Sequence, residues 1–291
     1  MRVCAYELNT CDEFLLFKIF PNTKIETARL GETTEELLQR ISQDFDVFAF
    51  HLDITNSTCI PLDRKLLVDT LKASGKLLIN HAMTDISKMF VQECCIRAKV
   101  PRTLARKEHS VNYPVIVKTK NNYGGNPEKL VDAGIRNLLG IELDESHKGP
   151  LHYQFSELHS IGNQIWSNQH LLVERFISNQ EERFFRAYFL FDRLVVSKVN
   201  DPARLKKMPI GIERTSRFFH LSGPIQTDSD FPVNLVTTVK RFITASGAQF
   251  GALDIVHDDL GNYYVIDLNL TPHWGDGGHS DLIRFLRESL D

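Results

Sequence analysis

Three oxygen-bearing side chains near the C-terminus, Asp254, Asp267 and Asn269, have the types and spacing expected of metal ligands. They fall in residues 251–272, which read as two short apolar strands joined by a polar turn around Gly261. Asp267 and Asn269 would share one face of the second strand, because side chains alternate along a strand. Carboxylates buried among apolar residues need a compensating cation. Hard oxygen ligands suit Mg²⁺ or Mn²⁺, so the pattern predicts a metal site that also binds nucleotide phosphates.

The segments before this hairpin have to support the metal interpretation, because acidic residues at strand ends also occur in hairpins that bind no metal. Over residues 1–80, strand-like and helix-like patterns alternate. They predict strands at residues 14–20, 46–52 and 76–80 and helices that begin at Thr33 or Thr34 and near Leu66. This alternation predicts a small α/β domain with a parallel sheet.

Residues 81–170 form a second segment, in which a helix over 80–96 is followed by a strand over 113–118 that ends in Lys118. A turn-rich loop with Gly124 and Gly125 comes next, and a helical pattern then resumes. Residues 140–169 show weak periodicity and many polar side chains, so we expect an irregular connection there.

From residue 171 to the C-terminus the pattern is mostly β. It predicts a strand at 171–177, a hairpin at 184–199 and a helix at 232–246 with one apolar face, followed by the metal hairpin. We therefore expect an α/β (α+β) protein with a domain at 1–80 and two subdomains at 81–170 and 171–291.

Composition narrows the class of protein. The 42% hydrophobic and 24% charged fractions of this 291-residue chain are ordinary for a soluble globular enzyme. A net charge of −3 gives no electrostatic signal for nucleic acid or an anionic membrane. The five cysteines include the neighbours Cys94 and Cys95 but no CxxC pair, which argues against a disulfide framework and a cysteine-based structural zinc site. Without a signal-peptide pattern or a membrane-spanning apolar run, we expect a cytoplasmic protein.

From about Asn80 onwards, the order of these elements resembles the ATP-grasp superfamily. The most specific motif is Asn269-Leu-Thr-Pro272, which is similar to the Asn-x-x-Pro ending of that family's metal site. The resemblance implies two α+β subdomains that clasp ATP, preceded by a small α/β domain, with Mg²⁺ or Mn²⁺ held by Asp254, Asp267 and Asn269. The family normally has glutamate as the middle ligand, and the shorter Asp267 puts two-metal catalysis in doubt.

Two lysines and a glycine pair carry the resemblance in the central segment. Lys118 closes its strand as the family's phosphate-binding lysine does, and Lys88 matches an earlier lysine with a similar role. Gly124 and Gly125 resemble the glycine loop that closes over the phosphates, where backbone N–H groups approach an anion without a Cβ in the way. Taken alone, a lysine at a strand end is usually solvated and a Gly-Gly pair is usually an ordinary turn.

The strand at 171–177 resembles the family's adenine-binding linker. The resemblance implies that Glu174 and the backbone of Arg175 and Phe176 hydrogen-bond adenine. It also implies that Glu182 binds the ribose hydroxyls and that Arg186 points toward phosphate or substrate.

Arg214 and Arg217 lie where the family places a basic residue near the reacting phosphate, and the sequence does not decide between them. The resemblance implies a carboxylate–amine ligase. The carboxylate attacks the γ-phosphate of ATP to give an acyl phosphate, and an amine then displaces phosphate. Small-molecule or peptide carboxylates and amines would be the substrates, and the chain would be able to form a homodimer. Two alternatives stay open, an ATP-grasp small-molecule kinase and a catalytically inactive nucleotide-binding protein.

Directly after the metal motif comes a glycine-rich tail with His273, Trp274 and His279, which we interpret as a loop for the acceptor substrate. The two histidines could also bind a metal. No cysteine or paired acidic residue lies near them in the sequence, so we favour the substrate loop.

Overall fold

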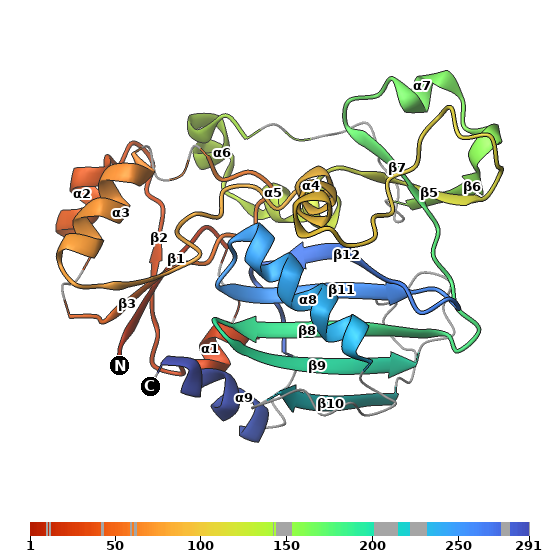
Figure 1. Cartoon of the computed structure of the whole chain (residues 1–291). Helices are drawn as coiled ribbons and strands as arrows, with labels where there is room; N and C mark the ends of the chain where they lie inside the picture. Colours follow the sequence, from red (N-terminus) through yellow and green to blue (C-terminus); the bar gives the residue numbers. More distant parts are fainter. Residues whose placement is uncertain are drawn as a thin grey trace.

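The computed structural model describes the chain except for residues 10, 12, 42–43, 59, 61–62, 142, 144–152, 201–214, 222–231, 275–279 and 291. In the described part, the strands form three sheets with helices packed between and around them (Figure 1). The α/β (α+β) class expected from the sequence is confirmed. Within the same described residues, no helix is long and apolar enough to cross a membrane.

The N-terminal part is a parallel four-stranded sheet in the order β2-β1-β3-β4. Its strands are β1 (Val3–Glu7), β2 (Lys24–Thr27), β3 (Val47–Phe50) and β4 (Leu77–Ile79), and its helices include α2 (Thr34–Arg40) and α3 (Arg64–Ala73). Thr33 caps α2, and its side chain and that of Glu36 bond each other's backbone N–H in a capping box. The parallel sheet predicted for residues 1–80 is present, and the division of the chain into a domain at 1–80 stays a prediction.

Residues 14–20 do not form the strand predicted from their apolar residues. They contain helix α1 (Leu15–Ile19) instead, so that prediction was wrong. Leu15, Leu16 and Ile19 are buried, and this spacing puts them on one face of a helix. The face packs on α9 (Ser280–Arg287) in a core shared with the large sheet. Packing between distant segments has overridden the local strand preference.

The central part is an antiparallel sheet in the order β6-β5-β7. Its elements are α4 (Lys88–Ala98), β5 (Pro114–Thr119), η1 (Asn122–Gly125), α5 (Asn126–Leu130), α6 (Ala133–Leu139), β6 (Tyr153–Glu157), η2 (Leu158–Ser160), α7 (Asn163–Trp166) and β7 (Leu171–Arg175). Residues 140–169 were predicted to be irregular, yet they contain β6 and α7. Strand β7 pairs with β5, so the central sheet continues past residue 170, where the sequence analysis placed a boundary between subdomains.

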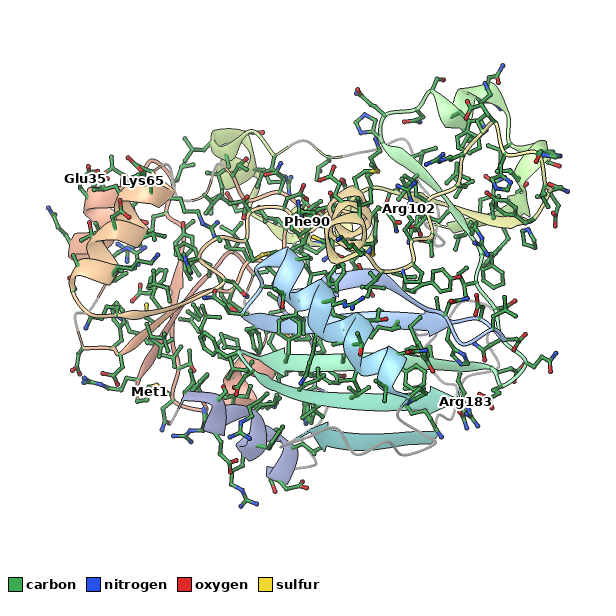
Figure 2. The ribbon with its side chains drawn as sticks, in the orientation of Figure 1. Met1, Glu35, Lys65, Phe90, Arg102 and Arg183 are labelled. Carbon is green, nitrogen blue, oxygen red and sulfur yellow. The ribbon has the colours of Figure 1, made fainter. Side chains whose placement is uncertain are left out.

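The largest sheet is antiparallel and has the order β10-β9-β8-β11-β12. It consists of β8 (Arg183–Leu190), β9 (Arg193–Asn200), β10 (Thr215–Leu221), β11 (Phe250–His257) and β12 (Tyr263–Asn269), and is accompanied by α8 (Val233–Ser246) and η3 (Glu288–Leu290). Helices α4 and α8 cover one face, and side chains fill the layer between them and the sheet (Figures 1 and 2). Phe90, labelled in Figure 2, packs against this cluster from α4. The other face lies against α1, α9 and the N-terminal sheet.

Gly251 allows β11 and β12 to approach closely beside Asn269. A Cβ at this position would lie 2.7 Å from the carbonyl oxygen of Asn269 and 3.2 Å from Cζ of Phe189. We therefore expect Gly251→Ala to lower the free energy of unfolding by roughly 1–3 kcal/mol, the usual cost of overpacking. Urea unfolding measures the change, and an unaltered value would mean that the strands separate freely here.

Candidate functional site

The register of the large sheet gathers the three predicted metal ligands on one face. Asp254 lies directly opposite Asp267, and Ala252 lies opposite Asn269. The register then shifts, so that Ile255 pairs with Val265 and one residue of β12 is bulged. Asp254 and Asp267 are each only 5% exposed. The Asn269 side-chain oxygen accepts a hydrogen bond from the Thr271 N–H at 2.8 Å, which fixes its orientation.

Each buried carboxylate has a cation as partner. Arg186 of β8, opposite Asp254 in register, donates from Nε to Oδ1 at 2.8 Å and from Nη2 to Oδ2 at 3.3 Å. The Asp254 carboxylate holds the pKa of the Arg186 guanidinium well above its ordinary value. Lys88, the first residue of α4, forms a buried ion pair with Asp267. Helix α4 therefore delivers a cation to the face that carries the predicted metal ligands.

The third ion pair of the site joins Lys118 of β5 to Glu174 of β7. Burial lowers the pKa of the Lys118 ammonium, and the charge of Glu174 only partly offsets that effect. Gln92, one turn after Lys88 on α4, donates from Nε2 to Glu174 Oε1 at 2.7 Å. The sequence did not single out Gln92, because a glutamine inside a helix carries no motif.

The charges of this site balance. Lys88, Lys118 and Arg186 supply three positive charges, and Glu174, Asp254 and Asp267 supply three negative charges. The six side chains come from α4, β5, β7, β8, β11 and β12, so the central sheet and the large sheet both contribute. Two lysines, an arginine and converging oxygen ligands on adjoining sheets could hold a metal ion together with a polyphosphate.

Comparison with known proteins gave a match only at the level of structure. No family model matches the sequence, and no curated protein matches it. A RimK domain ATP-grasp protein from Sphaerobacter thermophilus DSM 20745 is similar over 99% of this chain and 98% of its own, with a TM-score of 0.55 and 15% identity. For D-alanine–D-alanine ligase from Bacillus anthracis both coverages are 100%, with a TM-score of 0.52 and 11% identity.

A third similar structure is the ATP-grasp ligase PsnB complexed with a minimal precursor, which matches over 94% of this chain and 92% of its own, with a TM-score of 0.52 and 14% identity. The chain has the ATP-grasp fold. The ATP-grasp architecture expected from the sequence is confirmed over nearly the whole chain, including the N-terminal sheet.

Three residues that the ATP-grasp resemblance predicts to bind adenine or ribose are placed less favourably for that role. The Arg175 N–H donates to the Thr103 carbonyl at 2.7 Å and the Phe176 N–H donates to the Pro114 carbonyl at 2.9 Å, so adenine would need other backbone groups of this segment. Glu182 is exposed in the turn before β8, with a φ of 52°. Their binding roles stay predictions.

The two arginines expected near the reacting phosphate are not both described. Arg214 lies outside the described residues. The backbone of Arg217 belongs to β10, at the edge of the large sheet opposite to β12, where it pairs with Lys198.

The glycine pair predicted to close over the phosphates lies in a segment attached to the loop after β3. Gly124 and Gly125 lie in η1 with φ values of 67° and 76°. The Asn122 N–H bonds Thr55 Oγ1 at 2.8 Å, and the Thr55 N–H bonds Glu128 Oε1 at 2.7 Å. This segment is therefore held from both sides by the loop after β3.

Asp53 also belongs to the contact between the N-terminal sheet and this segment. Both of its carboxylate oxygens accept from Asn9 Nδ2, at 3.1 and 3.0 Å, and the same amide bonds the Pro127 carbonyl at 3.1 Å. Burial raises the pKa of Asp53 from 3.8 to about 6, and the charge of Glu128 adds to the effect. The ionised form is thus disfavoured in the folded chain.

A pH dependence of stability follows from Asp53. Between pH 3.8 and about 6 the folded chain keeps a proton that the unfolded chain has released, so stability falls as pH rises through this window. We expect wild type to lose roughly 3 kcal/mol relative to Asp53→Asn between pH 3.5 and pH 6.5. Urea unfolding of both proteins across this range measures the difference, and parallel pH profiles would contradict the assignment.

An apolar cluster on the same sheet face was not predicted from the sequence. Phe184 and Val256 lie two residues from Arg186 and Asp254 on their strands, so they share the face of the charged site. The cluster consists of Ile177, Phe184, Val199, Val256 and Tyr264, with Ile266 packed against it. An apolar cluster therefore adjoins the charged residues on this face of the sheet.

The structure provides no thiol nucleophile among the buried cysteines. Cys94 and Cys95 are buried on α4. Burial raises the pKa of Cys94 to about 11 and the pKa of Cys95 to about 12. Both thiols stay protonated at neutral pH and act as apolar core residues.

Proposed function

We propose that this chain is an ATP- and Mg²⁺-dependent ligase that activates a carboxylate as an acyl phosphate and joins it to an amine, with release of ADP and phosphate. The observation that carries the proposal is the charge-balanced set of three cations and three carboxylates where the central and large sheets meet, in which every side chain but the half-buried Arg186 is buried. Burying five of these six charges is costly, and perturbed ionisable clusters of this kind concentrate at functional sites.

The side chains fit both parts of a metal–nucleotide complex. Asp254, Asp267 and Asn269 present hard oxygen ligands on one face of a hairpin, and they would hold Mg²⁺, or Mn²⁺, which takes the same ligands. The bound ion would neutralise charge on the reacting phosphate. Lys88 and Lys118 would turn from their carboxylate partners toward phosphate oxygens.

Phosphoryl transfer needs little covalent chemistry from the protein. Positioning and charge neutralisation carry most of the barrier reduction, which is consistent with a site built from cations and carboxylates without a reactive thiol. Arg186 is fixed by two hydrogen bonds to Asp254, so its remaining guanidinium edge can be oriented toward a substrate carboxylate or phosphate.

The similar structures support the ligase reading. They include a D-alanine–D-alanine ligase and the ligase PsnB, the latter also complexed with a phosphomimetic precursor variant, Mg and ADP at a TM-score of 0.51 and 11% identity. We propose that this chain likewise acts on a small-molecule or peptide carboxylate and an amine, and that it works in the cytoplasm, where ATP is available.

The test begins with nucleotide binding. Isothermal calorimetry with a non-hydrolysable ATP analogue is expected to show binding that requires Mg²⁺ and is lost in Asp254→Asn. A folded wild type that binds no nucleotide would overturn the proposal.

Product analysis then separates the reactions. With candidate carboxylates and amines, ADP, phosphate and a new amide identify the ligase. ADP with a phosphorylated alcohol would identify a kinase, and binding without turnover across the panel would identify a non-catalytic protein.

A further inference from the structure

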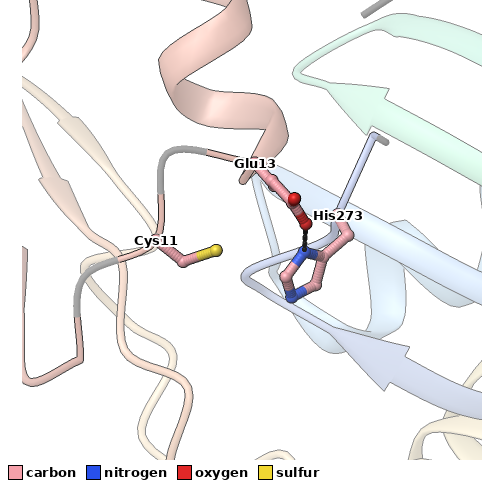
Figure 3. Close-up of side chains that lie close together, drawn as sticks. All are labelled: Cys11, Glu13 and His273. Atoms are coloured by element: carbon pink, nitrogen blue, oxygen red, sulfur yellow. Dashed lines mark ion pairs between the residues drawn. The ribbon is translucent and has the colours of Figure 1, made fainter. Parts of the chain in front are cut away.

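A group of potential metal ligands outside the proposed nucleotide site joins the two ends of the chain. Cys11 and Glu13 lie in the loop after β1, and His273 follows the Asn269–Pro272 motif (Figure 3). One ligand atom from each residue lies within 4.8 Å of the others. His273 Nδ1 is 3.5 Å from Glu13 Oε2. Among the described residues, no other three His, Cys, Asp or Glu side chains bring their ligand atoms this close together.

The backbone holds these residues together independently of their side chains. Phe14 forms an isolated antiparallel bridge with His273. The Leu15 N–H bonds the Pro272 carbonyl at 2.8 Å, and the Trp274 N–H bonds the Glu13 carbonyl at 3.1 Å. The Phe14 ring also packs edge-on against the His273 imidazole, with ring centroids 4.7 Å apart. The imidazole therefore has a defined position beside the Cys11–Glu13 loop.

We propose that Cys11, Glu13 and His273 form a binding site for Zn²⁺. Thiolate, carboxylate and imidazole are all ligands that Zn²⁺ takes in tetrahedral sites. In such a site the donor atoms stand about 3.3–3.6 Å apart, so the group has to contract by roughly 1 Å. Glu13 and His273 are exposed and Cys11 is half-buried, which leaves the side chains free to make that adjustment.

The three protein ligands leave a fourth coordination position for water or a substrate atom. The donor set also separates this site from the hairpin ligands Asp254, Asp267 and Asn269. Those are oxygens alone, which suit Mg²⁺, whereas sulfur and imidazole nitrogen favour Zn²⁺. Zinc at this position would connect the loop after β1 to the segment that follows the nucleotide site.

Sequence spacing did not reveal the site because its ligands come from opposite ends of the chain. The tail histidines have no cysteine and no acidic pair near them in the sequence, and the fold brings Cys11 and Glu13 to His273. Cys4, Cys94 and Cys95 are buried elsewhere and cannot substitute for Cys11. Cys59 lies outside the described residues and serves as a control.

Zinc titration of the full chain tests the proposal. The chelator-treated protein, in excess Mg²⁺, is titrated with Zn²⁺ against a chromophoric indicator. We expect one Zn²⁺ per chain, with affinity weakened roughly tenfold or more in Cys11→Ser and in His273→Ala because each removes one ligand. Cobalt substitution is expected to give a thiolate-to-cobalt charge-transfer absorption in the wild type and none in Cys11→Ser.

Control variants test whether zinc binding depends on Cys11 and His273 in particular. Cys59→Ser removes another thiol and His170→Ala removes another exposed imidazole, and both are expected to bind Zn²⁺ as the wild type does. Asp254→Asn is also expected to keep zinc binding, which separates this site from the proposed nucleotide site. No stoichiometric zinc in the wild type, unchanged affinity in Cys11→Ser, or loss of zinc in Asp254→Asn would each overturn the proposal.

Discussion

Lys118→Met is expected to reduce ATP turnover by roughly 10²–10³-fold, the usual effect of removing one group that stabilises transition-state charge. Lys118 is 6% exposed and is one of the three cations of the site, beside Lys88 and Arg186. Methionine keeps most of the side-chain volume and removes only the charge. Steady-state release of ADP measures the change.

The variant also leaves Glu174 buried with Gln92 as its remaining partner, so a loss of folding has to be separated from a loss of catalysis. The double variant Lys118→Met, Glu174→Gln removes both charges and is expected to fold while staying inactive. Lys240→Met, on the exposed side of α8, is the matched control and should keep full activity. Turnover at the wild-type rate in folded Lys118→Met would rule out its role at the phosphates.

Asp267→Asn is expected to reduce Mg²⁺-dependent ATP turnover about as much as Lys118→Met does. The reason is that a neutral amide replaces a carboxylate that faces Asp254 across the hairpin. The measurement is ADP release over a range of Mg²⁺ concentrations. A weakened ligand would shift the required Mg²⁺ concentration upward, and a lost ligand would leave no activity at any concentration.

Stability is the control for this variant. Asp267→Asn leaves the Lys88 ammonium, which is 2% exposed, facing an amide oxygen, so urea unfolding has to show that the chain remains folded. Asp192→Asn, in the exposed turn between β8 and β9, changes the same charge away from the site and should have no effect. An unchanged Mg²⁺ dependence in folded Asp267→Asn would contradict the metal assignment.

The sequence predicted the parts of the site that depend on local pattern. Alternation along the second strand predicted that Asp267 and Asn269 share a face, and the observed register places Asp254 on the same face. Lys118 at the end of an apolar run and the capped helix at Thr33 are also local signals. The overall ATP-grasp architecture followed from the order of such elements.

Features that depend on contacts between distant residues could not be predicted. Residues 15–19 became a helix because their apolar face is buried against α9, from the far end of the chain. Gln92 gains its position only when α4 packs beside β7, which brings its amide to Glu174. The grouping of Cys11 with His273 likewise depends on the bridge at Phe14.

The pairing of Asp254, Asp267 and Glu174 each with one cation has a thermodynamic consequence. A nucleotide that bound alone would draw Lys88 away from Asp267 and leave that carboxylate uncompensated, and a metal bound alone would leave the lysine uncompensated. Each ligand therefore lowers the cost of binding the other, which is positive coupling between two sites that share one set of charges. Since coupling of binding free energies is reciprocal, Mg²⁺ should tighten nucleotide binding by the same factor by which nucleotide tightens Mg²⁺ binding.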